Sequence, residues 1–316
     1  MANETKNLEK ESQENVSYER IPSNGSEKKG SARLNVLKTY KLYIDGKFPR
    51  TESGRYTVLK NREEKSIANI CRASRKDFRD AVVAARKAQH GWAGKSAYNK
   101  GQILYRIAEV LEGRKAQFIS ELMQQGSSQT EAEAEVNLSI DRLVYYAGWS
   151  GKYQQVFSSV NPVESSHFNF SLPEPTCVVS ILSPGNLGLL GLVSTIAPAI
   201  VGGNAVIALA SKEKPLCAIT FAEVIHSGDV PAGVVNILTG FRNELLPHFS
   251  NHMDVNACVY CGSDAEEIKK VQINSSLNVK RAVIYSKDNW FDDDSQNPYR
   301  IMDLQEIKTT WHPIGI

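Results

Sequence analysis

Short apolar runs separated by helical patterns dominate the second half of the chain. The runs carry no charge, are rich in valine and isoleucine, and lie at 177–182, 205–209, 234–238, 255–260 and 282–285. The clearest helical patterns between them span 187–201, 215–225 and 264–271. Uncharged strands that alternate with helices are typical of a parallel sheet covered on both faces. We therefore predict an α/β fold with a parallel sheet across 177–290.

The region before this sheet has a different pattern. Tyr40, Leu42 and Ile44 alternate with polar residues, and Asp45-Gly46 follows as a favoured hairpin turn. Apolar residues then recur at helical spacing between positions 78 and 147. We expect residues 38–160 to form a strand with a hairpin, followed by helices.

Residues 1–37 are rich in Asn, Glu, Lys and Ser and contain few apolar side chains. Such a segment buries too little apolar surface to offset its ordering entropy. We predict a disordered tail there, with a tail that folds on contact with a partner as the alternative.

Charge and hydropathy argue against two classes of partner. The chain has 37 Lys and Arg against 35 Asp and Glu, so nothing favours binding to nucleic acid or to an acidic membrane surface. An uncharged stretch spans 175–211, but turns at 183–186 and 202–204 interrupt it. A transmembrane helix needs about 20 continuous apolar residues. We expect a buried strand-helix-strand unit here and no membrane span.

Cysteine usage favours a reducing compartment. The five cysteines are an odd number in a long chain, and the first residues lack the apolar core of a signal peptide. We expect a cytoplasmic protein without a disulfide framework. Cys258 and Cys261 form a CxxC pair, but residues three apart on a strand point to opposite faces. We therefore favour a structural role over a redox or zinc pair.

Two other groups could hold a metal ion. His248 and His252 have helical ligand spacing, but no further ligand accompanies them. Asp292, Asp293 and Asp294 could form a cation site, although a solvated linker across 291–303 is the better interpretation. We expect no metal.

The carboxyl ends of parallel strands are where such sheets bind ligands. The turns that follow the predicted strands there contain Ser183, Pro184, Asn186, Gly240, Gly262 and Ser263. Ser183 and Ser263 could also be proposed as nucleophiles, but neither has a histidine nearby in sequence, so a turn role is favoured.

These turns resemble motifs of the aldehyde dehydrogenase superfamily, and the matches are collinear from about Leu42 to Tyr285. The matching segments are Tyr145-Tyr146-Ala147-Gly148-Trp149, Ser183-Pro184-Gly185-Asn186, Ile196-Ala197-Pro198-Ala199, the run from Val230 to Phe241, and Cys261-Gly262-Ser263. The resemblance implies a Rossmann-like cofactor sheet. It also implies a cysteine nucleophile, an asparagine that stabilises the oxyanion, a glutamate base and NAD or NADP as cofactor.

Several positions depart from the pattern that this resemblance implies. Asn186 matches the oxyanion asparagine, although a role in turn geometry explains it equally well. Leu209 stands where the family has a lysine that holds the cofactor ribose, and the ribose glutamate falls at Lys212, or at Glu213 in another register. Arg242 replaces a glycine beside the phosphate turn, and Tyr285 stands at the position of the general base.

The catalytic part is the largest departure. The family's nucleophile lies well after the base strand, but no cysteine follows Cys261 here. The segment 304–311 nevertheless resembles the strand that joins the family's oligomerisation arm after the catalytic domain. We therefore predict arm segments at 161–176 and 304–316, joined to a cofactor-type sheet whose catalytic domain is missing.

Three functions are consistent with this sequence. The first is a non-catalytic pseudoenzyme, a scaffold or regulatory subunit that assembles with itself or with a complete aldehyde dehydrogenase. The second is an NAD(P)-dependent aldehyde dehydrogenase that a partner chain completes. The third is a nucleotide-binding sensor in which the strand-end residues still bind NAD or NADP.

Overall fold

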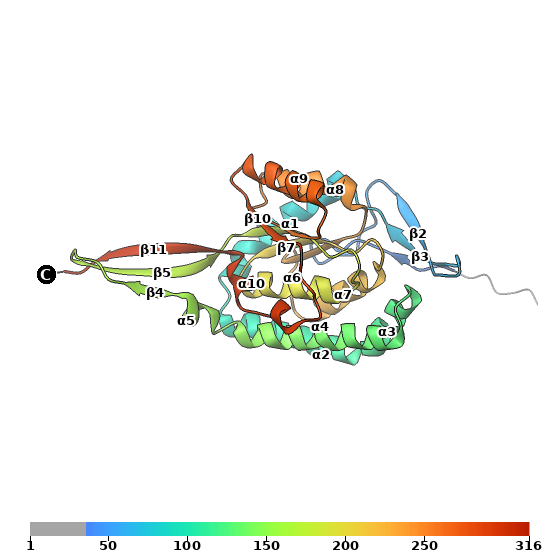
Figure 1. Cartoon of the computed structure of the whole chain (residues 1–316), viewed down its shortest axis with the longest axis horizontal. Coiled ribbons are helices and arrows are strands. Elements are labelled where there is room, and N and C mark those ends of the chain that lie inside the picture. Colours follow the sequence, from blue (N-terminus) through green and yellow to red (C-terminus); the bar gives the residue numbers. More distant parts are fainter. Residues whose placement is uncertain (1–35, 316) are drawn as a thin grey trace, which may run out of the picture. The chain divides into compact units, whose positions relative to one another are not determined.

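A five-stranded parallel sheet forms the centre of the protein in a computed structural model, which describes residues 36–315. All four strand pairings are parallel. The strands lie in the order β10 (Arg281–Tyr285), β9 (Ala257–Cys261), β6 (Val178–Leu182), β7 (Ala205–Leu209), β8 (Val235–Leu238) (Figure 1). Every residue of β6 to β9 is buried, which explains their uncharged sequences. The prediction of an α/β fold is confirmed.

Helices cover both faces of the sheet. One face packs against α6 (Leu190–Val201) and α7 (Leu216–Ser227), with α2 (Ala97–Gly113), α3 (Lys115–Gln124) and α4 (Gln129–Trp149) further out. The other face packs against α1 (Arg75–Ala93), α8 (Arg242–Asn251) and α9 (Ala265–Ser276). The sequence pattern missed α8, because Pro247 lies inside it and proline usually interrupts a helix.

The N-terminal part forms a small sheet of its own. β1 (Thr39–Tyr40) pairs in parallel with β3 (Ser66–Cys71), which pairs antiparallel with β2 (Tyr56–Lys60). The hairpin turn is present, because Ile44 and Lys47 exchange both backbone hydrogen bonds. Asp45 and Gly46 have φ angles of 52° and 69°, the left-handed values that this turn requires. The predicted tail, 1–37, lies outside the described residues except for its last two.

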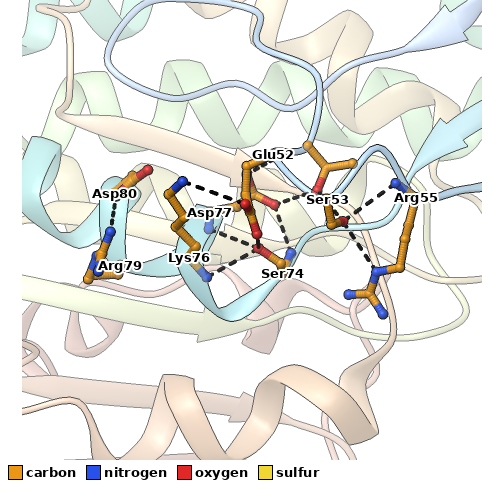
Figure 2. A network of polar contacts seen from close by, with 9 residues as sticks. Glu52, Ser53, Arg55, Ser74, Lys76, Asp77, Arg79 and Asp80 are labelled. Carbon is orange, nitrogen blue, oxygen red and sulfur yellow. Dashed lines mark hydrogen bonds and ion pairs between the residues drawn. The ribbon is translucent and has the colours of Figure 1, made fainter.

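The first turn of α1 is anchored to the loop that precedes β2. The buried Asp77 carboxylate accepts hydrogen bonds from Thr51 Oγ1 at 2.6 Å and from the Ser74 amide at 2.8 Å. Ser74 in turn accepts from the Asp77 amide, so the two residues form a capping box. Figure 2 shows this network, in which Lys76 also approaches Glu52.

A three-stranded antiparallel sheet projects from the central sheet (Figure 1). We call it the arm, and it consists of β4 (Ser159–Asn161), β5 (His167–Pro175) and β11 (Gln305–Pro313). β5 lies between the other two strands, and α5 (Tyr153–Phe157) leads into β4. The arm therefore begins at Ser159, two residues before the boundary that the family resemblance implied.

The segment between β10 and β11 is only partly a solvated linker. Its acidic residues, 292–294, are exposed as expected. The segment nevertheless contains a 3-10 turn at Asp293–Ser295 and the helix α10 (Tyr299–Met302). Ser295 of the turn and Arg300 and Ile301 of α10 are buried. Trp290 is also buried. The prediction of a linker across 291–303 must be corrected, because this segment packs against α4 and α6 and covers one side of the core.

Candidate functional site

The predicted ligand-binding residues gather at one edge of the sheet. Ser183, Pro184 and Asn186 follow β6, Gly240 follows β8, and Gly262 and Ser263 follow β9. Because these strands are parallel neighbours, their carboxyl ends lie along the same edge. Ser183 and Pro184 are buried, whereas Asn186 and Ser263 are exposed. The structure therefore brings this set together, with two members facing solvent.

Arg242 crosses this edge. It is the first residue of α8, directly after the β8 turn, and its Nη2 donates a hydrogen bond to the main-chain carbonyl of Ser183 at the end of β6. Its Nη1 lies 3.6 Å from the Glu267 carboxylate on α9. One guanidinium group therefore connects the turns that follow three different strands.

Tyr260, on β9, contacts both Arg242 and Glu267. Its side chain is fully buried, and its hydroxyl donates a hydrogen bond to Glu267 Oε2 at 2.8 Å. The Arg242 guanidinium lies 5.2 Å from the centre of the Tyr260 ring. Burial raises the pKa of Tyr260 to about 12, and the carboxylate of Glu267 adds to this effect. The phenol therefore stays protonated and acts as a donor at neutral pH.

The turn after β9 leads into an acidic helix start. Asp264 caps α9 by accepting a hydrogen bond from the Glu267 amide at 2.9 Å. Glu266 and Glu267 lie in the same first turn. Carboxylates stabilise a helix N-terminus and satisfy its free amides. The N-terminus of α9 is therefore already stabilised by carboxylates of the chain itself.

A small cavity lies between the residues that follow β7 and β8 and the strands β2 and β3. Phe241 has the Arg72 guanidinium at 4.4 Å from its ring centre and the Lys212 ammonium at 5.0 Å. These side chains, with Gly240 and Ser211, line a cavity of about 80 Å³. Leu209, at the end of β7, is buried and offers no hydrogen-bonding side chain.

The turn that carries Asn186 is held by a residue that the sequence analysis missed. Glu135, on α4, is buried, and its Oε1 accepts hydrogen bonds from the amides of Gly188, Leu189 and Leu190 at 2.9, 2.8 and 3.2 Å. Its only sequence signal is a glutamate on the apolar stripe of a helix. Asn186 itself is exposed, and its side chain makes no hydrogen bond within residues 36–315.

Tyr285 is committed to structural contacts. Its hydroxyl donates a hydrogen bond to Asp303 Oδ2 at 2.7 Å, and its ring contacts both the Trp290 ring and the guanidinium of Arg300. Burial and the nearby Asp303 carboxylate raise the pKa of Tyr285 well above its usual value. A phenol with this environment does not accept a proton, so Tyr285 cannot replace a carboxylate base.

The cysteines do not form an activated nucleophile. All five are free thiols, and only Cys177 is partly exposed. Burial raises the pKa of Cys217 well above its usual value and that of Cys258 to about 11. Cys258 and Cys261 belong to the cores on opposite faces of the sheet, as their spacing predicted. Nucleophilic cysteines need a lowered pKa and access to a ligand.

Neither a metal site nor a membrane-spanning helix is present among the described residues. Across positions 36–315, no three His, Cys, Asp or Glu side chains gather closely enough to hold a metal ion. Burial lowers the pKa values of His248 and His252. None of the helices in this range combines the length and hydropathy that crossing a membrane requires.

The parallel sheet, its helices on both faces and its strand-end turns define a Rossmann-like α/β fold. A model of the aldehyde dehydrogenase family matches residues 48–284. The chain belongs to the aldehyde dehydrogenase family.

Individual relatives support this assignment. The putative aldehyde dehydrogenase DhaS of Bacillus subtilis is 31% identical over 251 residues, which cover 78% of this chain and 50% of DhaS. Omega-crystallin of Enteroctopus dofleini is 29% identical over 251 residues, with the same two coverages. The solved structure of PnpE from Pseudomonas sp. WBC-3 superposes with a TM-score of 0.75 at 25% identity, over 78% of this chain and 51% of PnpE. The NAD⁺ complex of a Bacillus cereus aldehyde dehydrogenase has a TM-score of 0.74 at 24% identity, over 78% of this chain and 50% of that protein.

The match covers only part of each relative. The chain spans about half the length of the curated relatives it matches. The activity of the complete relatives therefore does not transfer to this chain by similarity alone.

Proposed function

We propose that this chain is a non-catalytic scaffold or regulatory subunit of the aldehyde dehydrogenase type that assembles through its arm. The pairing of β11 with β5 carries this proposal. It runs over nine residues, from Gln305 opposite Pro175 to Pro313 opposite His167. Only residues 286–304 separate β10 from β11. The chain thus keeps an assembly strand while lacking the catalytic part that the family resemblance implies between them.

The surface of the arm suits association. Phe168 and Leu172 are 43% and 40% exposed on one face of the arm. Ile307 and Trp311 are 55% and 57% exposed on the other face, because the register pairs them with Pro173 and Asn169. β11 is also an edge strand, so its outer backbone groups are available to pair with another chain. The partner is a second copy of this chain or a complete aldehyde dehydrogenase with a matching arm.

The segment after β10 favours this role over completion by a partner chain. Arg142 on α4 binds the main-chain carbonyls of Trp290 and Asp292, and the Tyr146 hydroxyl donates to the carbonyl of Asn297. The segment that joins β10 to β11 is therefore packed on the chain's own core. The family resemblance implies a catalytic part at this point of the chain, and this packed segment stands there instead.

The nucleotide-sensor alternative has weaker support. Its predicted residues do gather at one sheet edge, but Arg242 and Glu267 occupy that edge together. The cysteines offer no nucleophile with a lowered pKa, which also disfavours an independent oxidoreductase. Five free thiols are consistent with a cytoplasmic location, which we propose on that basis.

Substitutions on the arm test the proposal. Ile307→Glu and Trp311→Glu place charges on one face of the edge strand β11. Each should abolish the assembly formed by the wild-type chain or its complex with a purified aldehyde dehydrogenase from the same organism. Val83→Glu is the matched control, because Val83 is 63% exposed but lies on α1. Assembly that survives both arm substitutions would contradict the proposal.

A further inference from the structure

We infer that Arg242 closes the cofactor cleft from inside, so that this chain does not bind NAD or NADP. The inference concerns the sheet edge and is independent of assembly through the arm. An assembled chain that binds the cofactor would overturn the inference and leave the proposed function standing.

The Arg242 side chain lies over the turn that follows β9. Dinucleotides bind where main-chain groups of strand-end turns are bare enough for the pyrophosphate to approach. Gly262 would offer such a surface after β9. However, a Cβ atom built on Gly262 would lie 3.0 Å from the Tyr260 hydroxyl and 3.1 Å from Arg242 Nη1. The space above this glycine is therefore filled by two side chains of the protein.

The charges at this edge also disfavour a bound pyrophosphate. The guanidinium of Arg242 is partnered by Glu267 and by the Ser183 carbonyl, so its positive charge is already compensated. Asp264, Glu266 and Glu267 surround the start of α9, and the Asp264 carboxylate takes up the amide of Glu267. A pyrophosphate placed here would meet carboxylates in place of free amides.

The space at the ends of β7 and β8 is small. The cavity near Phe241 has a volume of about 80 Å³, whereas pockets for drug-sized ligands measure roughly 300–1,000 Å³. Leu209 supplies no polar group there, and Lys212 lies against the ring of Phe241. The residues of this edge thus do not fit a dinucleotide, and Arg242 with Glu267 fills the place of its phosphates.

The full chain would be titrated with NAD⁺ and with NADP⁺ in a calorimeter, and its melting temperature would be measured with each cofactor present. A complete aldehyde dehydrogenase is the positive control. We expect no saturable heat and no rise in melting temperature at about 1 mM of either cofactor. With a dissociation constant of 10 µM, a ligand at 100 times that concentration would stabilise the protein measurably.

Two variants test the role of Arg242 itself. Arg242→Ala should lower the melting temperature by about 3–6 °C, because it removes charge-assisted hydrogen bonds that connect three strand-end turns. Arg75→Ala is the matched control, since Arg75 is also the first residue of its helix but is exposed, and it should change the melting temperature by no more than about 1 °C. Saturable binding of either cofactor to the wild-type chain, or an unchanged melting temperature for Arg242→Ala, would overturn the inference. The wild-type titration decides the matter even if the variant fails to fold.

Discussion

Arg142 and Trp290 are 148 residues apart in the sequence, yet the buried guanidinium of Arg142 donates a hydrogen bond to the main-chain carbonyl of Trp290. The same group also binds the Ser194 hydroxyl on α6 and the carbonyl of Asp292. Burial lowers the pKa of Arg142 to about 10, so the side chain remains charged at neutral pH. One residue of α4 thus holds the segment after β10 against the core.

Replacing Arg142 tests this attachment. Arg142→Met should lower the free energy of unfolding by about 2–4 kcal/mol, because buried carbonyls lose their charged donor. Chemical denaturation measures the change, and hydrogen exchange should show faster exchange in residues 286–304. Arg106→Met is the control, since Arg106 forms only an exposed pair with Glu109 and should cost less than about 1 kcal/mol. Equal stability of the two variants would show that Arg142 does not hold the segment.

Glu135 provides a second test of a buried contact. Glu135→Ala leaves the amides of Gly188, Leu189 and Leu190 without their acceptor, so we expect a loss of about 2–4 kcal/mol in the free energy of unfolding. Glu133→Ala, two residues earlier on α4, should cost less than about 1 kcal/mol, because Glu133 accepts only from Gln129 at the surface. Urea unfolding of both variants makes the comparison. Similar losses in the two would mean that the turn after β6 does not depend on Glu135.

Lys280 should make stability depend on pH. It is 7% exposed, its Nζ donates to the His252 carbonyl at 2.9 Å, and burial lowers its pKa to about 8 from 10.5. Between these two values the unfolded chain binds more protons at this site than the folded chain, so the Lys280 contribution to stability rises with pH. Below about pH 8 its contribution is constant.

The measurement is urea unfolding from pH 7 to 9.5. The stability of the wild-type chain relative to Lys280→Met should increase with pH above about pH 8. Lys269→Met, on the exposed side of α9, should give a curve parallel to the wild type. A Lys280→Met curve that is also parallel would refute the buried environment of this amine.

Thiol reactivity should distinguish Cys177 from the other cysteines. Thiolates are the reactive species, and burial raises the pKa values of Cys217, Cys258 and Cys261. In the native state a thiol reagent should modify Cys177 first, and Cys177→Ser should remove this first phase. Five thiols should react once the chain is unfolded. Rapid native modification of Cys258 or Cys261 would contradict the buried positions of both side chains.

The central sheet could be predicted because its chemistry is local. Strands that are buried on both faces need uncharged side chains, and β6 and β7 show this directly in their sequences. The hairpin of β2 and β3 was missed because β2 is short and almost wholly exposed, so it has no continuous apolar run. The arm was predicted only through the resemblance, since β5 and β11 pair across more than a hundred residues.

The location of the candidate site at the strand ends could be predicted from the sequence. The side-chain contacts within it could not. Arg242 stood out as a bulky replacement for glycine, but its acceptors on Ser183 and Glu267 depend on how three strands are arranged. Glu135 and Arg142 were missed for the same reason. A charged residue on an apolar helical stripe indicates a buried contact, but the partner is determined by the tertiary fold.

Light scattering during size exclusion tests the central claim most directly. The chain has a mass of 35.0 kDa, and it would be measured alone and mixed with a purified complete aldehyde dehydrogenase from its own organism. We predict a particle of at least twice the mass of the chain, or co-elution with that enzyme, and loss of either on Trp311→Glu. A wild-type chain that remains a 35.0 kDa monomer at every concentration and never co-elutes would contradict the account.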